Sequence, residues 1–129
     1  MARAEREKGV RGEREVVAIL RRWGFACDRS PNSGGLFIPG DVVGVEGYHI
    51  EVKRQERLRL PEWLEQARSE APPNTLPVVV WRRSRDEWYA ALPLADLLYL
   101  IQRPTVDKTV DAVGMADELL QQAKRRGDS

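Results

Sequence analysis

Residues 41–53 read DVVGVEGYHIEVK, and this stretch decides the fold of the chain. Apolar runs on either side of a Glu-Gly pair predict two β-strands joined by a tight turn. Because side chains alternate across a strand, His49, Glu51 and Lys53 share one face of the second strand. With Asp41 opening the first strand, two carboxylates and an ammonium gather at the ends of an apolar hairpin. Burying them without a cation and water is costly, so the stretch predicts a metal site.

The length and composition predict one compact domain. The chain has 129 residues, of which 42% are hydrophobic, enough for a core and against global disorder. The formal net charge is only +1, so overall charge does not indicate a nucleic-acid partner. Local charge is uneven, because residues 1–35 carry eight Lys and Arg against five Asp and Glu. Most of the basic residues are arginines, which favour bidentate contacts with phosphate.

The chain lacks the marks of a secreted or membrane protein. Its single cysteine, Cys27, excludes a disulfide within the chain and fits a reducing compartment. The charged N-terminus has no apolar signal-peptide core, and the longest apolar runs, 76–81 and 92–101, are too short or interrupted to cross a bilayer. We therefore expect a cytoplasmic protein without a membrane partner.

Hydrophobic periodicity and turn residues predict an α/β domain. Pro61 marks the first turn of a helix, and Gly24 marks the end of another. The order of helix, three strands, helix, two strands and helices describes a mixed sheet flanked by helices. The expected helices cover residues 4–23, 61–71, 96–103 and 106–126, and the expected strands cover residues 25–29, 41–45, 48–53, 77–81 and 87–92.

Glu13 lies on the apolar stripe of the first expected helix. That stripe consists of Val10, Val16, Val17, Leu20 and Trp23. A carboxylate on a core-facing stripe needs a partner, which a metal or a buried arginine would supply. Alternatively, Glu13 borders the core and reaches solvent.

A set of short motifs accompanies these acidic residues. They are Lys8-Gly9, Gly12-Glu13-Arg14-Glu15, Trp23-Gly24-Phe25, Arg29-Ser30-x-x-Ser33, Gly40-Asp41, Ile50-Glu51-Val52-Lys53 and Leu60-Pro61-Glu62-Trp63-Leu64-Glu65-Gln66-Ala67. In this form the sequence resembles archaeal-type Holliday junction resolvases of the PD-(D/E)xK nuclease superfamily, and their phage-encoded members in particular. The resemblance covers about residues 6–90. It implies a restriction-endonuclease-like mixed sheet of about five strands flanked by helices, with residues 1–104 as the nuclease domain and 105–129 as a helical extension of it.

The resemblance also implies a metal centre. Asp41 and Glu51 would be metal ligands, and the Val52 carbonyl would complete the protein part of the shell. Glu13 would be the third acidic group, acting on a second metal or through water. Lys53 would be the catalytic lysine. Mg²⁺ is the expected cofactor, with Mn²⁺ able to replace it, because both accept carboxylate and water ligands.

Further residues follow from the same resemblance. Ser33 would be the catalytic serine of the loop at residues 30–35, with Ser30 as the alternative. On composition alone that loop is either a phosphate-binding loop or a plain linker. The residues expected to contact DNA are Lys8, Arg11, Arg14, Arg29, Ser30 and Arg54.

The implied activity is symmetric hydrolysis of four-way DNA junctions by a homodimer, in recombination and repair, in the host cytoplasm if a phage encodes the chain. Helix 96–103 or the apolar tip at 36–38 is the candidate dimer surface. Two alternatives stay open: a PD-(D/E)xK nuclease for other branched or linear DNA, and a non-catalytic DNA-binding module. The presence of Asp41, Glu51 and Lys53 together favours a catalyst.

Other polar and aromatic residues have an ordinary explanation. His49, the one histidine, is a ligand, a base or, more commonly for such a residue, a hydrogen-bonded structural side chain. Gln66 is an exposed helical residue unless its helix brings it to the site. Trp63, Trp81 and Trp88 occupy apolar positions typical of a core, although tryptophans also stack on unpaired bases.

Overall fold

The computed structural model of the chain describes residues 2–31 and 40–104. The predictions for Ser33, the tip at 36–38 and the helix at 106–126 lie outside those residues. The chain divides into two compact units, Met1–Leu97 and Leu98–Ser129, and each is described by itself. The predicted boundary at residues 104 and 105 stays a prediction.

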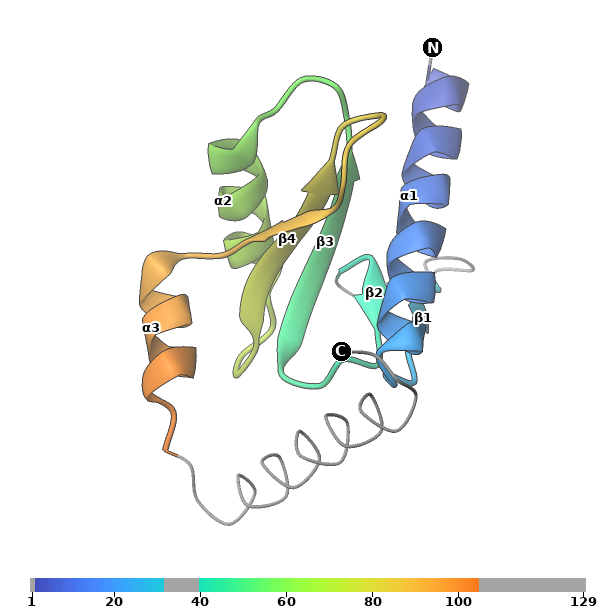
Figure 1. Cartoon of the computed structure of the whole chain (residues 1–129). Coiled ribbons are helices and arrows are strands. Elements are labelled where there is room, and N and C mark those ends of the chain that lie inside the picture. Colours follow the sequence, from blue (N-terminus) through green and yellow to red (C-terminus); the bar gives the residue numbers. More distant parts are fainter. Residues whose placement is uncertain (1, 32–39, 105–129) are drawn as a thin grey trace, which may run out of the picture. The chain divides into compact units, whose positions relative to one another are not determined.

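The elements follow the predicted order (Figure 1). They are α1 (Ala2–Arg22), β1 (Asp28–Arg29), β2 (Val42–Val43), β3 (Tyr48–Arg54), α2 (Leu60–Glu70), β4 (Leu76–Arg82), β5 (Tyr89–Ala91) and α3 (Leu94–Gln102). In the described parts of the chain, each helix is too short or too polar to span a membrane.

The five strands form one mixed sheet in the order β1-β2-β3-β4-β5. Only β3 and β4 run parallel, with Glu51 opposite Val79 and Lys53 opposite Trp81. A parallel pair needs a crossover connection, and α2 supplies it. Figure 1 shows α1 in blue and α2 in green on opposite sides of the two long strands. This arrangement confirms the predicted mixed sheet flanked by helices.

The face of the sheet toward α1 carries the larger apolar cluster. Its buried residues are Val16, Val17, Cys27, Val42, Ile50 and Val52. Trp23, predicted to lie on the same stripe of α1, is instead 78% exposed. The helix ends at Arg22, and Gly24 then turns the chain with φ +96°, so Trp23 lies past the last helical turn.

The opposite face packs on α2. Trp63 and Ala67, one helical turn apart, cover Val79 of β4, and Ala67 and Val79 are both completely buried. Trp81 stacks on Tyr89 of β5 with ring centroids 5.0 Å apart. Trp63 is therefore a core residue. His49, Glu51 and Lys53 lie on this same face of β3, as the alternation predicted.

The first two strands are shorter than predicted. β2 stops at Val43 because Gly44 adopts φ +100° and approaches the chain before β1 closely. A Cβ on Gly44 would lie 2.4 Å from the Ala26 carbonyl oxygen and 2.8 Å from the Cys27 Cα. This close approach joins the edge of the sheet to the turn after α1.

We therefore expect Gly44→Ala to lower the free energy of unfolding by about 3 kcal/mol, combining backbone strain with a steric clash. Gly47→Ala is the matched control, because Gly47 has φ +87° but open space around its Cβ position. It should cost only about 1 kcal/mol. Urea unfolding measures both values, and equal losses in the two variants would contradict the steric argument.

Candidate active site

A groove of about 590 Å³ runs between α1, the second half of β3 and α2. It is lined by Glu5, Lys8, Gly9, Glu13, Asp41, Glu51, Val52, Lys53, Arg54, Gln55, Glu56, Arg57 and Gln66. The fold thus gathers the predicted acidic residues, the predicted lysine and Val52 in one place, although Glu13 is 38 residues from Glu51 in the chain.

Asp41 is held at the point where β2 and β3 separate. Its backbone N–H donates to the Ile50 carbonyl at 2.8 Å, and Val42 opposite Ile50 is the last paired position of the two strands. The next free N–H on that edge of β3, of Val52, donates to Asp41 Oδ2 at 2.7 Å. The aspartate side chain thus replaces a strand carbonyl as acceptor, and this places its carboxylate beside Glu51.

Glu51 is the most perturbed acidic group of the groove. Its side chain is 5% exposed, and His49 Nε2 lies 3.0 Å from its Oε1. Burial first, and then the carboxylates of Asp41 and Glu70, raise the pKa of Glu51 to about 9. The carboxyl is therefore protonated at neutral pH when no cation is present. A divalent cation at this position would favour the ionised form, which is the chemistry expected of a metal ligand.

Glu13 pairs with an arginine, one of the partners that the sequence analysis considered for it. Arg29 Nε donates to Glu13 Oε1 at 3.0 Å, from β1 to α1. Burial raises the pKa of Glu13, and the hydrogen bond from Arg29 opposes that rise. Arg29 thus already binds Glu13, so a contact with DNA would require its guanidinium to bind Glu13 and a phosphate together.

Lys53 is oriented by α2. Its Nζ donates to Gln66 Oε1 at 3.1 Å, and Gln66 Nε2 reaches Glu70 Oε1 at 3.4 Å. Gln66 is therefore a groove residue as well as an exposed helical one. Sequence reasoning missed Glu70, whose signal is its spacing of one helical turn from Gln66.

Two overlapping acidic sets meet at Glu51. One is the predicted set of Glu13, Asp41 and Glu51 in the groove. The other is His49, Glu51 and Glu70, whose potential ligand atoms lie within 4.8 Å of one another. The second set was not predicted from the sequence, because Glu70 comes from α2.

Comparison with known proteins assigns the chain to a family. A family model described as "Phage putative PDDEXK endonuclease" matches residues 4–124. The chain belongs to this family. The chain is therefore a nuclease-family protein, as the motifs predicted.

Two individual proteins extend the comparison. Protein D14 of Escherichia phage T5 is 29% identical over 120 residues, which cover 74% of this chain and 75% of that protein. Hjc, a Holliday junction resolvase from the archaeal hyperthermophile Archaeoglobus fulgidus, superposes with a TM-score of 0.50 and 25% identity, covering 65% of this chain and 76% of Hjc. These likenesses confirm the resemblance to archaeal-type resolvases and the restriction-endonuclease-like fold.

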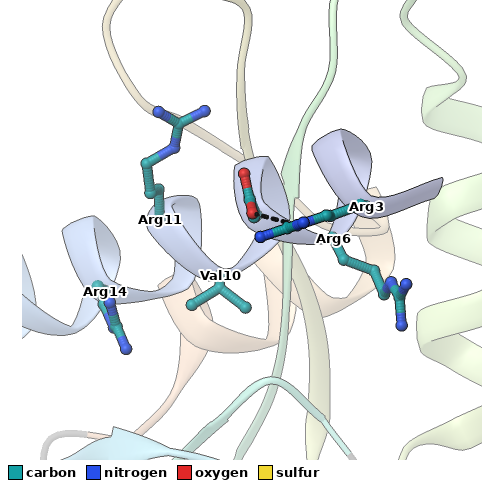
Figure 2. Close-up of a pocket in the computed structure, with 6 residues that line it drawn as sticks. Arg3, Arg6, Val10, Arg11 and Arg14 are labelled. Atoms are coloured by element: carbon teal, nitrogen blue, oxygen red, sulfur yellow. Dashed lines mark hydrogen bonds and ion pairs between the residues drawn. The ribbon is translucent and has the colours of Figure 1, made fainter. Parts of the chain in front are cut away.

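The nuclease carries an arginine-rich face on α1 (Figure 2). Arg3, Arg6, Val10, Arg11 and Arg14, with Glu7, line a hollow of about 480 Å³. Val10 thus lies among arginines instead of in the core. The guanidinium of Arg3 pairs with Glu7 at 3.2 Å, one helical turn along.

Arg14 also lines a second hollow of about 470 Å³ together with Arg29 and Ser30. Three of the residues predicted to contact DNA therefore lie around one depression. They come from α1, from β1 and from the position directly after β1, so the depression lies between the helix and the edge of the sheet.

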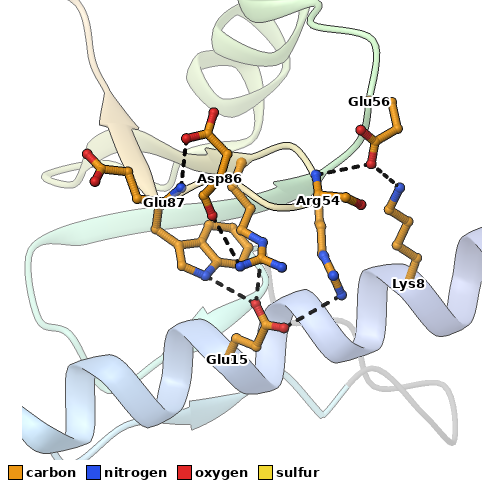
Figure 3. Close-up of polar contacts among 9 residues, drawn as sticks. Lys8, Glu15, Arg54, Glu56, Asp86 and Glu87 are labelled. Atoms are coloured by element: carbon orange, nitrogen blue, oxygen red, sulfur yellow. Dashed lines mark hydrogen bonds and ion pairs between the residues drawn. The ribbon is translucent and has the colours of Figure 1, made fainter.

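Lys8 and Arg54, also predicted to contact DNA, lie in ion pairs that join α1 to the sheet (Figure 3). Lys8 Nζ is 2.8 Å from Glu56 Oε1, and an Arg54 guanidinium nitrogen is 3.6 Å from Glu15 Oε1. The Trp88 indole N–H donates to the other oxygen of Glu15 at 3.2 Å. Because the Arg54 side chain is only 15% exposed, a contact with phosphate would require this network to open.

Proposed function

We propose that this nuclease is a divalent-metal-dependent endonuclease that resolves four-way DNA junctions as a homodimer. One observation carries the metal part of the proposal. Asp41 and Glu51 meet at the open end of the β2–β3 hairpin, with Glu13 and Lys53 lining the same groove. Carboxylates crowded at a buried position, with the pKa of Glu51 raised to about 9, are arranged for a cation.

The predicted metal ligands and Lys53 each have a role in the proposed reaction. The Asp41 and Glu51 carboxylates, with the Val52 carbonyl, would hold Mg²⁺ or Mn²⁺, both of which accept oxygen ligands. Glu13, kept in place by Arg29, would add a third carboxylate. When bound, the ion supplies Lewis-acid activation of the phosphodiester and acidifies a water. The Lys53 ammonium, oriented by Gln66, would neutralise negative charge on the attacked phosphate.

Junction specificity and dimerisation are the finer parts of the proposal. The likeness to Hjc, named as a Holliday junction resolvase, supports the junction as substrate. A four-way junction presents two related strands, so two sites in an isologous dimer suit it. The predicted dimer helix, observed as α3, exposes apolar side chains: Leu94 is 68% and Ile101 69% exposed. Exposed apolar surface of this kind is typical of a protein interface.

Cleavage of a labelled four-way junction tests the proposal, with linear duplex of the same sequence as control. Paired nicks on strands of like polarity, formed with Mg²⁺ or Mn²⁺ and absent with EDTA, are expected. Equal cutting of linear duplex would keep the nuclease and remove the junction specificity. Junction binding without cutting under every divalent ion would favour a non-catalytic module. Light scattering after size exclusion measures the dimer directly.

The arginine face of α1 gives a separate expectation for binding. We expect Arg11→Gln and Arg14→Gln together to weaken junction binding and to reduce the slope of log K against log salt by about 2, since each lost phosphate contact removes about 0.9. Arg68→Gln, which removes an exposed arginine from α2, is the matched control. Titrations in Ca²⁺ at several salt concentrations measure the slope, and an unchanged slope in the double variant would exclude this face from the interface.

A further inference from the structure

We propose that His49 is a positioning residue that holds the Glu51 carboxylate in the orientation a bound cation requires. The inference rests on the proposed function, because it concerns a ligand of the proposed metal. It adds a residue that the acidic motif does not contain, and that sequence reasoning explained as a structural histidine.

The first support is the contact itself. His49 Nε2 lies 3.0 Å from Glu51 Oε1, and both residues are almost completely buried, at 3% and 4% exposure. They are two residues apart on one face of β3, whose register with β4 is continuous from Tyr48 to Arg54. A hydrogen bond in such a rigid and enclosed place restricts the carboxylate rotation that solvent would otherwise permit.

The second support is the way the ring is seated. A Cβ on Gly40 would lie 3.3 Å from His49 Nδ1, 3.4 Å from its Cε1 and 3.3 Å from the Ile50 carbonyl oxygen. Gly40 also has φ +91°, which a side chain rarely adopts. The imidazole therefore packs on the backbone directly before Asp41 and reaches Glu51 with its other edge. The His49 side chain thus contacts both the backbone next to Asp41 and the carboxyl group of Glu51.

The chemistry of a neutral imidazole fits this role. With the proton on Nε2, the ring would donate to Glu51 Oε1 and would not occupy Oε2, which a cation could then bind. Partners of this kind, behind a metal ligand, typically change metal affinity or activity by about 10- to 100-fold when removed. The rival arrangement has Nε2 bind the ion directly, together with Glu51 and Glu70.

Because His49 is the one histidine of the chain, its ring nitrogens can be observed without assignment ambiguity. We expect NMR of the full chain labelled with ¹⁵N-histidine to show a protonated Nε2 when Mg²⁺ is bound, because the Glu51 carboxylate is then ionised and can only accept. An Nε2 without a proton in the Mg²⁺-bound protein would overturn the positioning role and favour direct coordination.

Variants give the second arm, with Mn²⁺ binding measured on the protein alone by electron paramagnetic resonance. His49→Phe keeps the ring shape without the donor, and we expect its Mn²⁺ dissociation constant to rise about 10-fold or more. His49→Gln restores an N–H donor at a similar reach and should recover most of that loss. Equal Mn²⁺ affinity in wild type and His49→Phe would overturn the inference, as would equal loss in both variants.

The wild-type arm separates this inference from the proposed function. If the wild-type chain binds neither Mn²⁺ nor Mg²⁺, the proposed metal site fails first, and the positioning role falls with it. If the wild type binds Mn²⁺ but the variants do not follow the expected order, only the role of His49 fails. Thermal unfolding of each variant identifies a change that comes from misfolding.

Discussion

We expect Asp41→Asn and Glu51→Gln each to reduce the proposed metal-dependent cleavage by at least about 10³-fold, which corresponds to about 4 kcal/mol of activation free energy. Each substitution keeps the size of the side chain and removes one carboxylate from the groove. A cation held by fewer charges is bound more weakly and stabilises the charge of the attacked phosphate less. Single-turnover cleavage of the four-way junction measures the effect.

The matched control lies on the same hairpin. Glu46→Gln removes a carboxylate from the exposed turn between β2 and β3 and should leave the cleavage rate within about 2-fold. Junction binding in Ca²⁺ should be similar in wild type and all three variants. Wild-type cleavage rates in Asp41→Asn would show that the groove is not the catalytic site of this nuclease.

We expect the stability of the cation-free protein to fall overall as the pH rises from about 4.5 toward 9. The pKa of Glu51 is raised from its ordinary value of 4.5 to about 9 by burial and by the neighbouring carboxylates. Between these two values the folded chain keeps a proton that the unfolded chain has lost. Each step upward in pH therefore favours the unfolded chain, until the folded carboxyl also ionises.

Glu13 acts in the same direction, because burial raises its pKa as well. Glu56 acts in the opposite direction, because its hydrogen bonds with Lys8 and Ser84 lower its pKa to about 2. Its effect on stability is confined to pH values below its ordinary pKa of 4.5. Burial also lowers the pKa of His49, which opposes the fall at pH values below the ordinary 6.5 of histidine. Above 6.5 the buried acidic groups decide the slope. A cation that binds only the folded chain adds stability and offsets their effect.

Thermal unfolding at pH 5 and pH 8, with EDTA or Mg²⁺, measures this dependence. We expect Glu51→Gln in EDTA at pH 8 to melt higher than wild type, by on the order of 5 °C, and to lose most of the pH dependence. Mg²⁺ should raise the melting temperature of wild type more than that of Glu51→Gln. A variant that is less stable than wild type at pH 8 in EDTA would contradict the assigned pKa shift. A substitution that abolishes cleavage while raising stability is typical of a residue retained for function.

Local sequence determined the hairpin that carries the site. Alternating apolar residues and a Glu-Gly turn over 41–53 give β2 and β3, with Glu51 and Lys53 on one face. The period of α1 likewise placed Val16 and Val17 in the core. These features depend on neighbours within a few residues, so periodicity and turn chemistry are enough to predict them.

The ends of elements and the partners of polar groups were decided by the tertiary structure. Trp23 lies outside the core because the helix ends one residue earlier than predicted, and Arg54, predicted to contact DNA, pairs with Glu15 of α1. A short shift in a helix end or a nearby opposite charge changes the direction of a side chain, and neither is encoded in local periodicity.

The contacts between side chains in the groove were likewise decided by the tertiary structure. The sequence by itself determined that Glu13, Asp41, Glu51 and Lys53 are present with the order and spacing of a metal-dependent nuclease. Only the fold brought Arg29 to Glu13 and the α2 residues to Lys53 and Glu51. The reason is physical: strand alternation and helical period act over a few residues, whereas hydrogen bonds and shifted pKa values in the groove arise between segments that meet only when the sheet closes between α1 and α2.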